Sequence, residues 1–419
     1  MSQATRILLA LIAGLVIGIA AASVSADWAL AATKITQPIG SAWLHGLQMV
    51  IVPLIVGLLV TGVGATADAA RAGRIAGRSV VMFVILLWSA TLMSALLVPL
   101  LLKLWPLPAA WAEALRTSLS HAATPAGTVP NLGAFFDTVV PTNVVTAAAA
   151  DAFLPLTVFA ITFAFAITRL PPEPRALLTG FFQAIVDTML VIITWVLKLA
   201  PIGIFALAYG VGAQTGAAAF GALLHYIVTV SAIGLVVLLA AYPVAAIFGR
   251  VGILRFARAV APAQAVAIST QSSLASLPAM LKASAELGAP ATSAGITLPI
   301  AVAIFRATSP AMNLAVALYV AHLLGMPIGP GALAAGVATA AITTMGSVSL
   351  PGTISFFASV APVAVAMGVP IEALGLLVAV ETIPDLFRTV GNVTMDVAVT
   401  ISVARADGGA AEPDVEIVT

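Results

Sequence analysis

Residues 381–396 read Glu-Thr-Ile-Pro-Asp-Leu-Phe-Arg-Thr-Val-Gly-Asn-Val-Thr-Met-Asp, with apolar runs on both sides. In a helix that advances about 100° per residue, the polar side chains of this stretch share a face about 100° wide. They are Glu381, Asp385, Arg388, Thr389, Asn392 and Asp396. A charge at mid-bilayer costs roughly 2.5–3.5 kcal/mol, so several on one stripe need a reason. Asp385 and Arg388 lie three residues apart and can pair, which allows a purely structural network. We favour a polar stripe that binds a charged solute.

The composition predicts a polytopic membrane protein. The chain is 61% hydrophobic and 8% charged, whereas soluble domains are about a quarter charged. Its lysines and arginines form no long run, so we expect no nucleic-acid partner. The absence of cysteine excludes disulfides and thiolate metal sites. We find no zinc-protease motif, nucleophile elbow or P-loop, so we expect neither an enzyme nor an ATP-driven pump, and no organic cofactor.

The apolar segments predict an all-α membrane protein with eight transmembrane helices and two re-entrant helical hairpins. About twenty apolar residues cover the hydrocarbon core. Six segments precede Arg250; they are 6–25, 40–64, 76–104, 151–169, 176–208 and 217–249. Four follow it; they are 252–288, 293–323, 330–366 and 370–404. Segments 252–288 and 330–366 carry Pro, Gly and Ser clusters at their middles and are the predicted hairpins.

The basic residues predict the topology. If the spans alternate and the two interrupted segments return to the side they enter, most lysines and arginines outside the spans fall on one side. By the positive-inside rule this side, with both chain termini, is cytoplasmic. Two kinked full spans are the alternative to hairpins, but they place Lys282 and Arg405 on conflicting sides.

The two predicted hairpin tips are alike. The first, 269–278, is rich in serine, and the second, 344–352, holds Gly and Pro; both contain Ser-Leu-Pro. Two interrupted segments in corresponding positions of an inverted repeat indicate a binding site near the bilayer midplane. Amide groups at helix N-termini there favour an anion.

Together these features resemble the dicarboxylate/amino acid:cation symporters, the glutamate transporter homologues. The most specific match is Asp385-x-x-Arg388-Thr389-x-x-Asn392-Val-Thr-x-Asp396 in the last span. Further landmarks are Pro-Thr-Asn at 141–143, Ala-Pro-Ile-Gly-Ile-Phe-Ala-Leu at 200–207, Ser272-Ser273 through Pro278, and Gly346 through Gly352. The resemblance covers nearly the whole chain.

The resemblance implies a homotrimer in the lipid bilayer of a bacterial cytoplasmic (inner) membrane, working by elevator-type alternating access. Residues 1–75 and 125–212 would form a static scaffold domain. Residues 76–105 and 213–405 would form a mobile transport domain, with the second hairpin as the extracellular gate. We expect residues 406–419 to be a disordered tail.

The resemblance also implies residue roles. Asp385 would bind a substrate ammonium, and Arg388 would bind a side-chain carboxylate as a bidentate fork. The remaining predicted substrate-binding residues are Ser272, Ser273, Arg306, Ser309, Leu350, Pro351, Thr389 and Asn392. The predicted ion-coupling candidates are Thr344, Ser347, Glu381, Asn392 and Asp396, with a residual sodium site at Asn392 and Asp396.

The seventh span departs from the family. The family places Asn-Met-Asp-Gly-Thr in the unwound middle of this helix, where it holds sodium. A gap-free alignment puts Phe305-Arg306-Ala307-Thr308-Ser309 there. A guanidinium repels a nearby sodium ion by several kcal/mol at low effective dielectric. Arg306 therefore replaces the bound cation, pairs with Asp385, or reaches a substrate carboxylate itself; the sequence leaves all three open.

We therefore predict a secondary active transporter for an acidic amino acid such as aspartate or glutamate, with weakened or absent sodium coupling. Asp385 favours an amino acid over a plain dicarboxylate, and Arg388 favours an acidic side chain. Proton coupling, with Glu381 or Asp385 as the carrier, or exchange would substitute for sodium. The alternative is a carrier of C4-dicarboxylates or another small organic anion. A more distant alternative is an anion channel.

Overall fold

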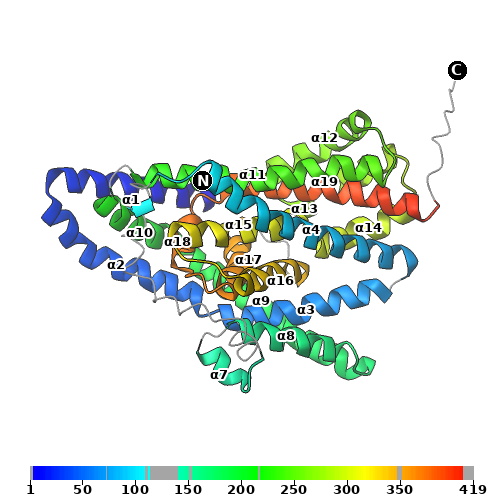
Figure 1. Ribbon diagram of the computed structural model, residues 1–419, viewed down its shortest axis with the longest axis horizontal. Helices are drawn as coiled ribbons and strands as arrows, with labels where there is room; N and C mark the ends of the chain where they lie inside the picture. The colour runs from blue at the N-terminus through cyan, green and yellow to red at the C-terminus, as the bar shows by residue number, and fades with distance from the viewer. Residues whose placement is uncertain are drawn as a thin grey trace.

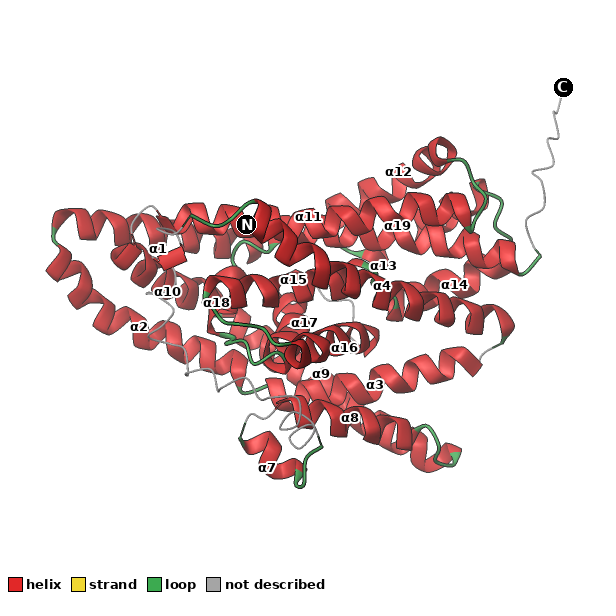
Figure 2. Ribbon diagram, in the orientation of Figure 1, coloured by secondary structure: helices red, strands yellow, loops and turns green. Residues whose placement is uncertain are grey.

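The computed structural model describes residues 3–71, 73–108, 112–113, 140–150, 153–215, 218–346 and 352–408. Over these ranges the chain consists of helices and connecting loops, with no strand (Figure 2). The predicted all-α class is thus confirmed for the described residues. Six of their helical stretches are long and apolar enough to cross a membrane.

The helices of the first half follow the predicted apolar segments. They are α1 (Gln3–Val24), α2 (Ala26–Gln48), α3 (Ile51–Arg71), α4 (Arg74–Leu104), α7 (Val144–Ala149), α8 (Phe153–Ile167), α9 (Pro172–Lys198), α10 (Ala200–Thr215) and α11 (Ala218–Ile247). Those of the second half are α12 (Ile253–Thr270), α13 (Ser273–Glu286), α14 (Ala291–Ile304), α15 (Thr308–Leu323), α16 (Pro330–Gly346), α17 (Gly352–Ala366), α18 (Glu372–Leu377) and α19 (Thr382–Ala406).

Two predicted boundaries differ from the structure. The predicted segment 40–64 is divided between α2 and α3 at 49–50. Its first helix begins at Ala26 rather than near residue 40, because Ser25 caps α2 by accepting a hydrogen bond from the Trp28 amide at 3.3 Å. The predicted segment 176–208 is divided between α9 and α10 at Leu199. Pro201 explains this break, because proline fits the first turn of a helix but not its interior.

Each of the four segments after Arg250 is a pair of helices. The segments predicted as hairpins hold α12 with α13 and α16 with α17, and the helices of each pair pack together. The seventh span is interrupted at 305–307, where the gap-free alignment places the unwound family motif. The last segment is interrupted at 378–381, just before Pro384, which again lies in a first helical turn.

Small residues set the closest helix approach. Helix α1 packs on α10 through Gly14 and Gly18, where an added Cβ would lie 2.6 Å from the Phe205 carbonyl oxygen and 2.4 Å from that of Tyr209. This spacing is the small-xxx-small pattern of packed membrane helices. Helix α2 joins the same group, whereas α3 packs with α8 and α9.

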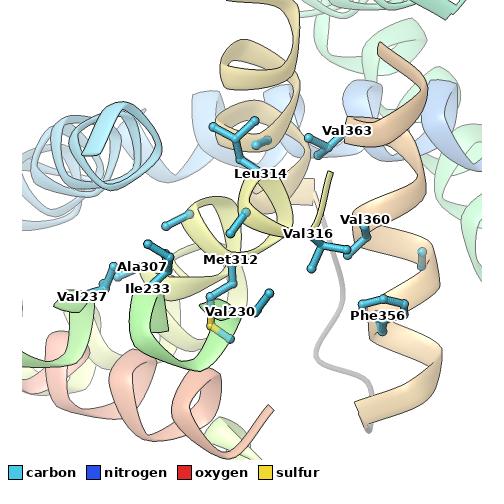
Figure 3. Close-up of a cluster of buried hydrophobic side chains, with 14 of the residues drawn as sticks. Val230, Ile233, Val237, Ala307, Met312, Leu314, Val316, Phe356, Val360 and Val363 are labelled. Atoms are coloured by element: carbon cyan, nitrogen blue, oxygen red, sulfur yellow. The ribbon is translucent and has the colours of Figure 1, made fainter. Parts of the chain in front are cut away.

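Helix α15 lies at the centre of the second half. Figure 3 shows Met312 of α15 beside Val230 and Ile233 of α11, and Val316 beside Val360 of α17. Helix α19 runs along α11 and also contacts α12, α13, α14 and α15 (Figure 1). The breaks in the seventh and last spans thus lie inside a packed group of helices.

Candidate functional site

The Arg388 guanidinium lies at the centre of the polar stripe. Its Nη2 lies 2.7 Å from Oε1 of Glu381 and its Nε lies 3.4 Å from Oδ1 of Asp385, while its Nη1 donates to Oδ1 of Asn313 at 2.8 Å. The Arg388 and Glu381 side chains are only 8% and 1% exposed. The predicted i,i+3 meeting of Asp385 and Arg388 is present, but the shorter ion pair is with Glu381.

Glu381 reaches Arg388 because the two residues are seven apart, about two helical turns, and the Glu381 carbonyl already accepts the helical hydrogen bond from the Asp385 amide at 2.9 Å. Glu381 precedes the first residue of α19, and the turn at 378–381 joins it to α18. The other Glu381 carboxylate oxygen accepts a hydrogen bond from the Tyr226 hydroxyl of α11 at 3.1 Å. A buried carboxylate with a guanidinium on one oxygen and a phenol on the other is well compensated.

Asp385 is less firmly held than Glu381. Its one ion pair among the described residues is the 3.4 Å contact with Arg388, although Arg306 also attracts it. The Thr389 hydroxyl donates to the Asp385 backbone carbonyl at 3.0 Å, so it stays on its own helix. Of the two carboxylates that pair with Arg388, Asp385 is therefore the more available to a new cationic partner.

Thr308 and Asn392 join the break in the seventh span to α19. Oδ1 of Asn392 accepts hydrogen bonds from the Thr308 amide at 2.9 Å and the Thr308 hydroxyl at 2.6 Å. The same hydroxyl lies 2.7 Å from the Arg388 carbonyl. Gly391 permits this approach, since an added Cβ would lie 2.3 Å from the Thr308 methyl group. The contact fixes the start of α15 against the polar stripe.

Arg306 lies in the 305–307 break and is 7% exposed. It is attracted by Asp385 and Asp396 and repelled by Arg388. Its neighbour Phe305 stacks on Phe83 of α4, with ring centroids 4.4 Å apart. Arg306 therefore interacts electrostatically with charged groups along the stripe, from Asp385 and Arg388 to Asp396.

Asp396 is fully buried, and neither carboxylate oxygen has a hydrogen-bond partner among the described residues. Arg306 attracts the Asp396 carboxylate electrostatically. At the predicted residual sodium site, Asn392 has its amide oxygen engaged by Thr308, so Asp396 supplies the available oxygens. Among the described residues, no cluster of three or more His, Asp or Glu side chains is placed to hold a metal ion.

The predicted hairpin residues are only partly placed. Ser272 caps α13 by accepting from the Ala275 amide at 3.2 Å, and Ser273 is buried behind it. Helix α13 packs against α19. Thr344 is buried and donates to the Ala340 carbonyl at 2.7 Å. The predicted residues Ser347, Leu350 and Pro351 lie outside the described residues.

Three residues that bind the polar stripe were not among the site residues predicted from the sequence. Tyr226 and Asn313 bind the ends of the Glu381–Arg388 pair, and Thr308 binds Asn392. Ser309, which was predicted, contributes its carbonyl at 3.5 Å from Arg388. Tyr226 and Asn313 could have been found by their rarity in such an apolar chain. Tyr226 is one of four tyrosines, and Asn313 is an amide in an apolar segment.

Apolar helices around a buried ionic network define a multi-pass membrane protein with an internal polar site. The sequence profile of the sodium:dicarboxylate symporter family matches residues 4–406. The chain belongs to this family, which confirms the resemblance inferred from the last span. The family consists of transporters, so the expectation that the chain is not an enzyme is also confirmed.

The curated relatives are distant but nearly full length. The proton/glutamate-aspartate symporter of Escherichia coli (strain K12) is 25% identical over 408 residues, covering 96% of this chain and 92% of that protein. The proton/sodium-glutamate symport protein of Bacillus subtilis (strain 168) is 25% identical over 418 residues, covering 97% and 92%. The C4-dicarboxylate transport protein of Rhizobium johnstonii is 24% identical over 375 residues, covering 88% and 82%.

Proposed function

We propose that the protein is a secondary active transporter for an acidic amino acid such as aspartate or glutamate, with weak or absent sodium coupling. The observation that carries this proposal is the buried network around Arg388, in which Glu381 holds the guanidinium and Asp385 is held less firmly. Family membership supports transport, and two of the relatives described above are named for glutamate.

The charge balance of the interior favours an amino acid. Three buried carboxyl groups, Glu381, Asp385 and Asp396, face two guanidinium groups, Arg306 and Arg388. When all are ionised, one negative charge is in excess. A dicarboxylate brings two more negative charges, whereas an acidic amino acid brings one because its ammonium offsets a carboxylate. Uncompensated charge in a low-dielectric interior is costly, so the amino acid and an accompanying cation are favoured.

Substrate binding is then an exchange of carboxylates on Arg388. The substrate side-chain carboxylate replaces Glu381 on the guanidinium fork, while the substrate ammonium binds Asp385. Glu381, released from its cation, takes up a proton that travels with the substrate. Proton coupling thereby follows from the 2.7 Å pair that the substrate must open.

The remaining contacts are proposed from the family resemblance. Thr389 and Asn392 would hydrogen-bond the substrate, and the Ser272–Ser273 turn would bind its α-carboxylate. The Ser272 cap supports this role, because a helix N-terminus favours an anion. Leu350 and Pro351 would cover the site.

Arg306 accounts for weakened sodium coupling in this proposal. Its attraction by Asp396 and Asp385 supports its role as a tethered charge in place of a bound cation. A direct role for Arg306 in binding a substrate carboxylate is the other reading, and it predicts loss of transport rather than altered ion dependence when Arg306 is replaced.

The proposed elevator follows the two groups of helices. Helices α4, α11 to α14, α16 and α17 pack around α15 and α19, whereas α1, α2 and α10 pack together and α3 packs with α8 and α9. Helix α3 also packs on α16 and α4, and these contacts join the groups. We propose that the first group is the transport domain (residues 76–105 and 213–405) and that the others are the scaffold (1–75 and 125–212) of a homotrimer. The chain would lie in a bacterial inner membrane with both termini cytoplasmic.

Counterflow in proteoliposomes tests the substrate class. Vesicles loaded with unlabelled aspartate should accumulate labelled aspartate or glutamate from outside, saturably, and Arg388→Gln should abolish this accumulation. Counterflow in vesicles loaded with succinate, but not in vesicles loaded with aspartate, would replace the proposal with the C4-dicarboxylate alternative. The name of the Rhizobium relative supports that alternative. Non-saturable flux without counterflow would indicate a channel instead.

A further inference from the structure

Four arginines lie where α4 begins and where α11 and α19 end. Arg74 and Arg78 lie in the first turns of α4, Arg250 follows α11, and Arg405 lies in the last turn of α19. They line an open groove of about 1050 Å³ at the side of the molecule, at the right of Figure 1 where the red end of α19 meets the start of α4. None of the residues that line the groove belongs to the polar stripe, although Arg405 lies on the same helix, α19.

The groove changes from charged to apolar along α4. After Arg74 and Arg78 come Val81 and Ile85, each 59% exposed, and Phe248 on the opposite wall is also 59% exposed. A strongly cationic end that leads into an exposed apolar wall matches the shape of a phospholipid. The anionic headgroup lies at one end of such a molecule, and the acyl chains extend from it.

The backbone places Arg250 here at a cost. Arg250 has φ of 53°, a left-handed conformation that is unfavourable for a residue with a Cβ. The Val251 amide holds this turn by donating to the Ala245 carbonyl at 3.2 Å. Glycine is the usual residue at such a helix end, so an arginine in this position is notable. Gly249 lets the turn approach α19, since an added Cβ would meet Ile401 at 2.9 Å.

An internal carboxylate already occupies part of the cationic end. Oδ1 of Asp407 lies 2.8 Å from Nε of Arg74 and 2.9 Å from Nη1 of Arg78. These two guanidiniums are therefore placed to share one anionic oxygen. Arg250 and Arg405 are exposed and make no ion pair with another described residue.

We propose that this groove binds an anionic phospholipid, with its phosphate on the arginines and an acyl chain along Val81, Ile85 and Phe248. Guanidinium groups bind phosphate as bidentate forks, and basic pockets between membrane helices at the cytoplasmic face suit anionic headgroups. The positive-inside rule places this end at that face. The inference stands apart from the proposed transport function, because none of these residues belongs to the buried site.

Native mass spectrometry of the purified full chain tests the proposal with phosphatidylglycerol and phosphatidylcholine of equal chain length. We expect retention of phosphatidylglycerol at least tenfold above phosphatidylcholine. The variant R74Q/R78Q/R250Q should reduce that retention at least tenfold, because each arginine near an anionic lipid contributes about fivefold. The control R169Q/R175Q removes one arginine from the α8–α9 connection and one from the start of α9, and should leave retention unchanged.

A second variant covers the case in which the triple variant does not fold. Asp407→Asn removes the competing carboxylate and should increase phosphatidylglycerol retention several-fold. Equal retention of the two lipids, or an unchanged Asp407→Asn variant, would overturn the proposal. Inorganic phosphate at millimolar concentration should not displace the lipid; full displacement would show that a free phosphate, not a lipid, is what the arginines bind, and would overturn the proposal as well.

Discussion

The Glu381→Gln substitution tests the ionic network at its shortest contact. It removes a negative charge 2.7 Å from Nη2 of Arg388, in a pair whose side chains are 8% and 1% exposed. Breaking a buried ion pair by removing one partner costs about 3–5 kcal/mol, and the lower value applies because glutamine keeps an acceptor. With an unfolding entropy of about 2.1 cal/mol/K per residue over this chain, about 3 kcal/mol lowers Tm by roughly 3–4 °C.

The same substitution should tighten substrate binding. Glu381 competes with the substrate carboxylate for Arg388, and a hydrogen bond to a charged group contributes about 1.5–3 kcal/mol, so its loss should lower the Kd for aspartate about tenfold or more. The assays are a thermal-shift measurement and a binding titration on detergent-solubilised protein. Opposite signs for stability and affinity distinguish this account from simple damage to the fold.

Two controls accompany the test. Tyr226→Phe removes one hydrogen bond from Glu381 and should lower Tm by about 1–2 °C. Glu372→Gln alters a nearby carboxyl group on α18 that contacts Gln48 at 3.4 Å rather than an arginine, and should leave aspartate affinity unchanged. A Glu381→Gln variant as stable as the parent, with unchanged affinity, would refute the reasoning.

Three further predictions concern the break in the seventh span and its contact with α19. Gly391→Ala should destabilise the protein by about 1–3 kcal/mol in a thermal-shift assay, because its Cβ would meet Thr308, while Gly295→Ala, with nothing within 4 Å, should be neutral or stabilising; equal effects would contradict the packing argument. Thr308→Val should cost about 1–3 kcal/mol in the same assay, because the Asn392 amide oxygen and the Arg388 carbonyl lose their hydroxyl donor; an unchanged Tm would be inconsistent with this contact. Arg306→Met should make uptake into proteoliposomes respond to sodium, and a variant with the parent's ion dependence would exclude Arg306 as the surrogate cation.

Sequence periodicity predicted the polar stripe well, because a regular helix fixes which side chains share a face. Asp385 and Arg388 meet as their i,i+3 spacing indicated, and α19 is continuous through Asn392 and Asp396. The helix breaks at Pro201 and Pro384 were also marked in the sequence by proline, although we did not place the boundaries there.

The partners of the stripe could not be predicted, because they come from distant segments. Tyr226 lies 155 residues before Glu381, and Thr308 lies 84 residues before Asn392. Helical spacing predicted that Glu381 and Arg388 share a face, but it did not show that Glu381, rather than Asp385, makes the shorter contact with Arg388. Local sequence patterns predict which residues share one helix face, whereas tertiary packing determines which residues of other helices contact that face.

The central claim is that transport proceeds without a sodium requirement because Arg306 supplies a fixed charge in the site. The direct measurement is aspartate uptake into proteoliposomes in three conditions: an inward sodium gradient, an inward proton gradient in sodium-free buffer, and neither. The account predicts concentrative uptake with the proton gradient alone and little added effect of sodium. Uptake that depends fully on the sodium gradient, with none from the proton gradient, would contradict it.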